Sequence, residues 1–305
     1  MPDRRWRWLG AVLGVALLAL VLWRLVEYRD QLVVDWATLS WPLIGAALAA
    51  SCAAQFLLAS AWHVLIPATA AAGWRIDVAR WSVSLAGKYI PGKVFQAVLR
   101  LGSYRAQGGS TLVAPAMLRE ILLSMSAACA WVAVHLATTT MGPRALLWPI
   151  ALAALVLAVA ALPSASRPFG QLLRRLMPGQ VIATAPAQSR ILAAWGLQAA
   201  AYLLLGVSVW LLAIALAPGQ APGLLACLAG LCFGGVVGVA AIMVPAGIGV
   251  REAALAWYLA AWLPAGPAAL LAIAARLCLT AAEFAALLVG LWIVRAGPPT
   301  LPEPT

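Results

Sequence analysis

The chain has 305 residues, of which 65% are hydrophobic and 10% are charged, and its mean hydropathy is +0.97. This composition excludes a soluble globular domain. The formal net charge of +11 would suggest nucleic acid in a soluble protein, but here the basic residues lie mainly between apolar runs. That pattern is typical of the cytoplasmic loops of membrane proteins, so we expect an all-α polytopic integral membrane protein with no nucleic-acid partner.

The first apolar run, residues 8–23, follows a basic N-terminus. It resembles a signal peptide, but no small-x-small cleavage site comes after it. We therefore predict an uncleaved first span with a cytoplasmic N-terminus. A second span begins at Trp41-Pro42 and runs to about Ile66.

The next segment, residues 74–107, is too interrupted for an ordinary span. Its charged residues are Arg75, Asp77, Arg80, Lys88, Lys93, Arg100 and Arg105, with Gly87, Pro91 and Gly92 between them. We expect two short helices joined by this Gly/Pro elbow, either re-entrant or interfacial. Irregular backbone is tolerated at membrane depth only where protein or water covers it.

The rest of the chain alternates apolar runs with short breaks. We predict further spans at residues 112–139, 145–162, 191–216 and 266–294, and a second broken segment at 224–263 that is interrupted around residues 245–252. Residues 163–190 hold four arginines and no acid, which predicts a cytoplasmic linker. The fold class is therefore about six full spans plus two broken or re-entrant helical hairpins. They form a single domain, residues 1–295, with a cytoplasmic C-terminus and a disordered tail at 296–305.

The order of these segments contains an internal symmetry. Two units, residues 42–162 and 191–295, each place a broken segment between full spans. By parity the first broken segment enters from the cytoplasm and the second from outside. Inverted repeats with interrupted helices are a transporter architecture.

The first elbow carries the chain's only two lysines, in the stretch Gly87-Lys88-Tyr89-Ile90-Pro91-Gly92-Lys93-Val94-Phe95-Gln96. Its spacing nearly matches a phosphate-binding P-loop, but Val94 stands where a magnesium-binding Ser or Thr would be, so we reject nucleotide hydrolysis. Two interpretations remain open. The lysines and exposed backbone N–H groups bind a phosphate, or both lysines reach out to the cytoplasmic headgroups.

The second elbow contains Pro245, Gly247 and Gly249 and is followed directly by Arg251-Glu252. A glutamate in a first helical turn is favourable because of the helix dipole, so Glu252 can be only a cap. The dipole gives no such reason for Arg251, which we take as a candidate ligand for an anion.

Ionisable residues also occur inside predicted spans, where such groups usually face one another or a cavity. Arg276 and Glu283 lie on one face of the last span, two turns apart, so we expect each to pair with another helix. Arg119-Glu120 in the third span is expected to do the same. Counted together, Lys88, Lys93, Arg119, Arg251 and Arg276 exceed Glu120, Glu252 and Glu283 by two charges if all point inward. An anionic headgroup would neutralise that excess.

The histidines and cysteines indicate no enzyme chemistry. His63 and His135 lack neighbouring nucleophiles, and the five cysteines show no metal-ligand spacing. We expect no metal, no cofactor and no catalytic residue.

In the two elbow stretches the sequence resembles the transmembrane-region family of lysylphosphatidylglycerol synthases, a flippase-like domain of bacterial inner-membrane proteins. The matching residues are the first elbow stretch with Arg100, and Pro245-x-Gly247-x-Gly249-x-Arg251-Glu252 with Arg276 downstream. Two departures are Ala253, where the family pattern has Gly, and the order Arg119-Glu120, which the family usually shows reversed. The resemblance covers roughly residues 40–295 and implies lipid handling, without support for lysyl transfer.

We therefore expect a protein of the bacterial inner membrane that binds and translocates a phospholipid or a lipid-linked anion. The expected substrate-binding residues are Lys88, Tyr89, Lys93, Gln96, Arg100, Arg251 and Arg276, supported by Arg119, Glu120, Glu252 and Glu283. Two alternatives stay open. One is a membrane-embedded glycosyl or phosphoryl transferase acting on lipid carriers, and the other is a non-transporting partner of an envelope-biosynthesis enzyme.

Overall fold

The structure is a computed structural model that describes residues 39–89, 94–104, 109–139, 149–150, 152–153, 186–240 and 249–296. Every regular element in these ranges is a helix. In chain order they are α2 (Trp41–Leu65), α3 (Trp74–Ser84), the 3₁₀ helix η2 (Leu85–Tyr89), α4 (Val94–Ser103), α5 (Gly109–Ala137), α8 (Gln188–Leu216), α9 (Leu224–Ala240), α10 (Val250–Leu259) and α11 (Ala265–Arg295).

Four of the helices, α2, α5, α8 and α11, are long and apolar enough to cross a membrane. They correspond to the predicted spans at residues 42–66, 112–139, 191–216 and 266–294. The predicted span at residues 8–23, most of the predicted span at 145–162, most of the 163–190 linker and nearly all of the tail lie outside the described residues. The total of six spans therefore stays a prediction.

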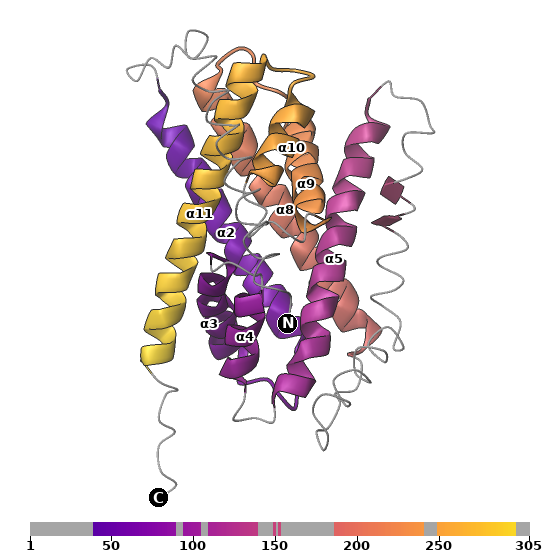
Figure 1. The fold of residues 1–305 in the computed structure, drawn as a ribbon, viewed down its shortest axis with the longest axis vertical. Helices are drawn as coiled ribbons and strands as arrows, with labels where there is room; N and C mark the ends of the chain where they lie inside the picture. Colours follow the sequence, from indigo (N-terminus) through magenta and orange to yellow (C-terminus); the bar gives the residue numbers. More distant parts are fainter. Residues whose placement is uncertain are drawn as a thin grey trace, which may run out of the picture.

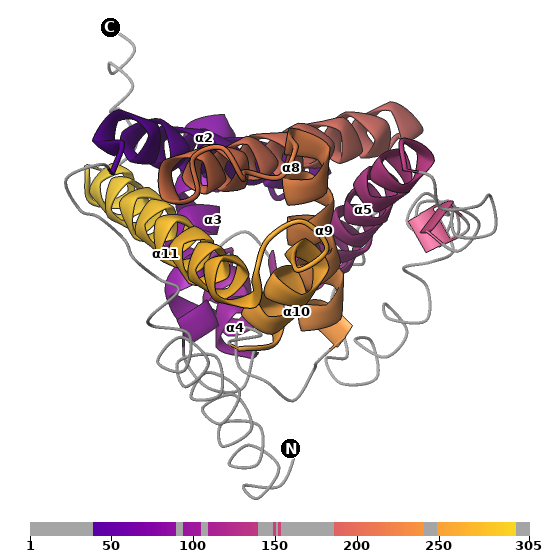
Figure 2. The same ribbon diagram turned by 90° about the horizontal axis from the view of Figure 1, so that it is seen from above.

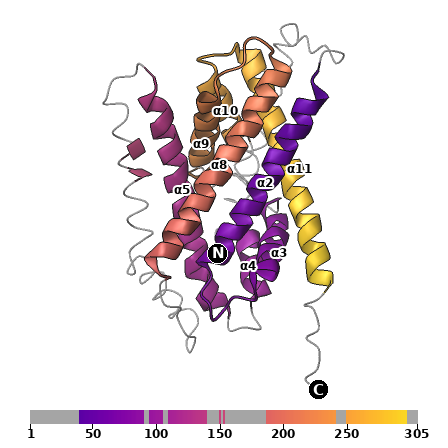
Figure 3. The same ribbon diagram turned by 180° about the vertical axis from the view of Figure 1, so that it is seen from behind.

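Both predicted broken segments consist of short helices. The first is divided into α3, η2 and α4, and the second into α9 and α10. Figures 1 and 3 show α3 and α4 at one end of the long helices and α9 and α10 toward the other end. Seen from above, α2 and α8 lie along one side of the bundle, α11 and α5 flank them, and α4 and α10 lie on the opposite side (Figure 2).

Helices α2 and α8 lie side by side and run in opposite directions (Figure 3). At one end, Arg190 in the first turn of α8 donates a hydrogen bond of 2.9 Å to the carbonyl oxygen of Ile66, just past the end of α2. Near the middle, Ser51 Oγ donates to Ser208 Oγ at 2.9 Å. This antiparallel pair joins the two halves of the chain.

The packing of the remaining helices follows an inverted repeat. Helix α3 packs on α11 as α9 packs on α5, and α2 contacts α3 as α8 contacts α9. Likewise α4 contacts α5 as α10 contacts α11, and α2 packs on α11 as α8 packs on α5. The described helices therefore form two units, α2–α5 and α8–α11, with equivalent neighbours and opposite orientation.

Candidate functional site

The first broken segment is joined to α11 by an ion pair between Lys88 and Glu283. Lys88 in η2 donates from Nζ to Oε1 of Glu283, which lies far from either end of α11. The Glu283 side chain is only 3% exposed, and that of Lys88 is 18% exposed. The contact requires η2 to lie deep in the bundle, and Gly87 makes this possible. A Cβ at Gly87 would collide with the backbone of Gln96, so only glycine allows η2 to pack so closely against α4.

The second broken segment is joined to the same helix. Gly249, with φ of +82°, turns the chain into α10 in a conformation that favours glycine. Its N–H donates to Oε2 of Glu252 at 2.6 Å, as in a capping box. The other oxygen of Glu252 faces Nε of Arg276 at 3.4 Å. Glu252 is therefore a cap and an ion-pair partner at once.

Arg251 lies against a row of glycines on α9. A Cβ at Gly234 would be 2.8 Å from the carbonyl oxygen of Arg251, and a Cβ at Gly238 would be 2.5 Å from its Nε. The absence of side chains at both positions makes room for the arginine. Its Nε is buried and has no hydrogen-bond partner among the described residues.

A cavity of about 240 Å³ lies where these groups meet, between α5, α8, α9, α10 and α11. Most of its lining is apolar, and the polar exceptions are Arg251, Glu252, Arg276, Ser124 and Tyr202. The hydroxyls of Ser124 and Tyr202 form a hydrogen bond of 2.8 Å to each other. An apolar cavity with guanidinium groups in its wall suits an amphiphile that carries an anion.

Arg100 and Glu120 form a separate cluster on α4, α5 and α3. Arg100 donates to Glu120 and, from Nε, to Ser84 Oγ at 3.1 Å. Its guanidinium carbon lies 4.6 Å from the ring centre of Trp62 and 5.6 Å from that of Trp81. The Trp81 indole N–H also donates to Glu120 at 2.6 Å.

This cluster occupies the place that the Glu252–Arg276 pair has in the other repeat, because both join the short helix to the following span. Here the basic residue lies on the short helix and the acidic residue on the span, which is the reverse of the Glu252–Arg276 pair. Neither Arg100 nor Glu120 lines the cavity.

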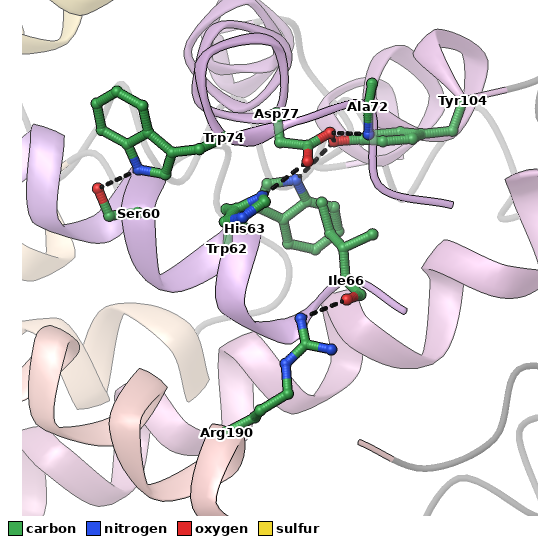
Figure 4. Close-up of polar contacts among 9 residues, drawn as sticks. All are labelled: Ser60, Trp62, His63, Ile66, Ala72, Trp74, Asp77, Tyr104 and Arg190. Atoms are coloured by element: carbon green, nitrogen blue, oxygen red, sulfur yellow. Dashed lines mark hydrogen bonds and ion pairs between the residues drawn. The ribbon is translucent and has the colours of Figure 1, made fainter. Parts of the chain in front are cut away.

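A third polar cluster, the Asp77 cluster, lies where α2, α3 and the end of α4 meet (Figure 4). The fully buried Asp77 accepts hydrogen bonds from the hydroxyl of Tyr104 at 3.0 Å and the backbone N–H of Ala72 at 3.2 Å. Its other oxygen is 2.8 Å from Nδ1 of His63. Tyr104 accepts in turn from the indole N–H of Trp62 at 3.1 Å. All these oxygens are occupied by protein groups, so the cluster holds helices together.

The structure brings together some of the residues that the sequence predicted. Lys88, Arg276, Glu252 and Glu283 pair across three elements, as expected for charges that seek partners on other helices. Arg119 is buried on α5, apart from the cavity lining. Gln96 on α4 is half-buried and does not line the cavity. The remaining predictions fall on residues whose side chains or whole positions lie outside the described part, namely Tyr89, Pro91, Gly92, Lys93, Pro245 and Gly247. The predicted excess of two charges therefore remains untested.

Sequence reasoning missed three features of the cavity. Ser124 and Tyr202 stand alone in apolar runs and give no signal of their own. The glycines of α9 do give one, because Gly230, Gly234 and Gly238 recur every fourth residue, and the last two lie against Arg251. That spacing lines one helical face with small residues and indicates close helix packing.

Metal-ligating side chains do not gather in the described ranges, where no three of His, Cys, Asp and Glu lie close enough to hold an ion. In comparisons with known proteins, no protein-family model matches the chain, and no curated protein matches it either. The resemblance to the lysylphosphatidylglycerol synthase transmembrane region stays a prediction.

Proposed function

We propose that this protein binds an anionic phospholipid or lipid-linked anion and moves it between the leaflets of the bacterial inner membrane. The observation that carries the proposal is the apolar cavity lined by Arg251, whose buried Nε has no hydrogen-bond partner in the part of the chain that the structure describes. A buried N–H group without an acceptor costs free energy, and a phosphate oxygen would satisfy it.

The cavity supplies what each part of such a ligand needs. Its apolar walls, which include Leu205, Leu231 and Leu255, suit hydrocarbon. Arg251 and Arg276 offer planar, fork-shaped donors that fit phosphate. Nε of Arg276 lies 3.4 Å from Oε1 of Glu252, which is longer than an ideal charge-assisted hydrogen bond. The Arg276 guanidinium can therefore turn partly toward a ligand.

The inverted repeat supports movement as well as binding. Transporters with this symmetry bind substrate near the midplane, where discontinuous helices of the two repeats meet, and expose it alternately to the two sides. Here Lys88 of the first broken segment and Arg251 of the second lie within electrostatic range of each other. The basic linker at 163–190 suggests which side is cytoplasmic.

The test is lipid translocation in proteoliposomes of phosphatidylcholine that contain acyl-labelled fluorescent phosphatidylglycerol. Dithionite bleaches only the outer leaflet, so a second, slower bleaching phase reports translocation. The wild type should show this phase. Arg251→Gln and the double variant Lys88→Ala/Lys93→Ala should abolish it while keeping the wild-type elution profile in detergent.

Arg295→Gln is the matched control, because Arg295 is an arginine at the exposed end of α11, remote from the cavity lining. Full translocation by Arg251→Gln would contradict the proposal. Turnover of a lipid-linked sugar donor by the purified protein would instead favour the transferase alternative.

A further inference from the structure

The polar groups that line the cavity fall into a charged part and a neutral part. Arg251, Glu252 and Arg276 come from α10 and α11, whereas Ser124 and Tyr202 come from α5 and α8. Helices α8 and α10 lie on opposite sides of the bundle (Figure 2), yet Tyr202 is within electrostatic range of Arg251. One ligand in the cavity can therefore contact a guanidinium group and the two hydroxyls at the same time.

The neutral part has hydrogen-bonding capacity that the protein leaves unused. The hydroxyls of Ser124 and Tyr202 are 2.8 Å apart, and neither has a further hydrogen-bond partner in the described ranges. Each hydroxyl carries one proton and two lone pairs, and the bond between them uses a single proton and a single lone pair. An O–H donor and several lone pairs thus remain at a wall that is otherwise mostly apolar, where an unused donor costs free energy.

The carboxylate in the lining is already engaged. Glu252 accepts the N–H of Gly249 through Oε2 and faces Arg276 through Oε1, and no second carboxylate lines the cavity in the described part of the chain. An ammonium group in the cavity would compete with Arg276 for Glu252 and would be repelled by Arg251. A neutral hydroxyl group meets no such repulsion, and it both donates and accepts hydrogen bonds. The lining therefore favours hydroxyl groups over amines.

The size of the cavity decides which part of a lipid meets these groups. Its volume of about 240 Å³ is below the roughly 300–1,000 Å³ of most drug-sized ligand pockets. A phosphate with a small headgroup fits such a space, whereas two complete acyl chains do not. The polar groups of the lining therefore act on the headgroup.

We propose that the Ser124–Tyr202 pair selects lipids whose phosphate carries a neutral, hydroxyl-bearing group such as glycerol or a sugar. This inference rests on the proposed function and names its substrate class. The phosphate binds Arg251, and a hydroxyl of the headgroup accepts the free O–H of the pair and donates to one of its lone pairs. A lipid of the same charge without hydroxyls leaves that O–H unused and binds less tightly.

The experiment compares lipids that differ in their hydroxyl groups alone. The detergent-solubilised full chain is titrated by calorimetry with short-chain phosphatidylglycerol and with short-chain phosphatidylpropanol, which has the same charge and the same headgroup carbon skeleton. The wild type should bind phosphatidylglycerol about tenfold more tightly. The glucosyl and cyclohexyl diesters of a short isoprenyl phosphate repeat the comparison for a lipid-linked sugar. The comparison with the larger ratio identifies glycerol or a sugar as the better headgroup.

Tyr202→Phe should lose most of this preference, and its affinity for phosphatidylpropanol should not change. Should that variant fail to fold, the double variant Ser124→Ala/Tyr202→Phe removes both hydroxyls, so that neither is left without its partner, and it should lose the whole preference. Tyr258→Phe is the matched control, since Tyr258 is also a half-buried tyrosine but lies outside the cavity lining. It should keep the wild-type ratio.

Equal affinity of the wild type for hydroxyl-bearing and hydroxyl-free lipids in both comparisons would overturn this inference and leave the proposed function intact. So would an unchanged preference in the double variant, or tighter binding of phosphatidylethanolamine than of phosphatidylglycerol. Failure of the wild type to bind any of the anionic lipids would overturn the proposed function as well.

Discussion

Glu252 and Arg276 face each other across α10 and α11, with Arg276 Nε 3.4 Å from Glu252 Oε1, and both line the cavity. The same carboxylate accepts the N–H of Gly249 at the start of α10. One side chain thus fixes the start of a short helix, its packing on a long helix and the position of the neighbouring Arg251.

Arg276→Gln should lower thermal stability in detergent, because it leaves Glu252 buried with the Gly249 N–H but without its cation. We expect a loss of about 3–5 kcal/mol. The double variant Glu252→Gln/Arg276→Gln should recover part of that loss, and a double-mutant cycle of unfolding midpoints measures the coupling. Strict additivity of the two single changes would show that the pair does not interact.

Gly238→Ala should weaken binding of anionic lipid, because its methyl group would occupy the space of the Arg251 side chain. Alanine is otherwise favourable in a helix by about 1 kcal/mol, so the helix itself should not suffer. Gly196→Ala in α8, where an added Cβ meets nothing within 4 Å, is the control. Lipid affinity is measured for both; equal affinity in the two variants would show that the position of Arg251 does not matter.

Gly87→Ala should destabilise the fold and displace Lys88, since the added Cβ would collide with the backbone of Gln96. Backbone cannot yield as a flexible side chain does, so we expect a loss of several kcal/mol. Gly102→Ala on α4 adds the same methyl group in open space and should be neutral or slightly stabilising. Thermal unfolding in detergent compares them, and a stable Gly87→Ala protein would contradict the close packing of η2 on α4.

Tyr104→Phe should lower stability by about 1–3 kcal/mol and leave lipid binding unchanged. The change removes the hydroxyl that donates to Asp77 and accepts from Trp62, so both groups lose a buried partner. Unfolding midpoints and lipid affinity are measured on the same preparation. Lost affinity without lost stability would mean that the Asp77 cluster serves the ligand as well as the fold.

The sequence was a good guide to where helices lie and where they break. Four of the predicted apolar runs form α2, α5, α8 and α11, because hydropathy over some 20 residues is a local property. Gly87 and Gly249 marked real breaks in the helices. Glycine is needed at position 87 because the backbone of Gln96 comes so close, and it is favoured at position 249 because φ is positive there. Of the charges inside spans, Glu120, Arg276 and Glu283 have partners on other helices, as expected.

The identity of those partners could not be read from the sequence. Lys88 and Glu283 are 195 residues apart, and several cations and carboxylates could have paired in many ways with similar local energies. The sequence grouped Arg100 with the ligand-binding residues, whereas folding directed it to Glu120 and two indole rings. Helices and their ends are specified by neighbouring residues, so the sequence by itself determined them. Pairings across the bundle, and the cavity between them, depend on how whole helices pack, so only the tertiary structure decided them.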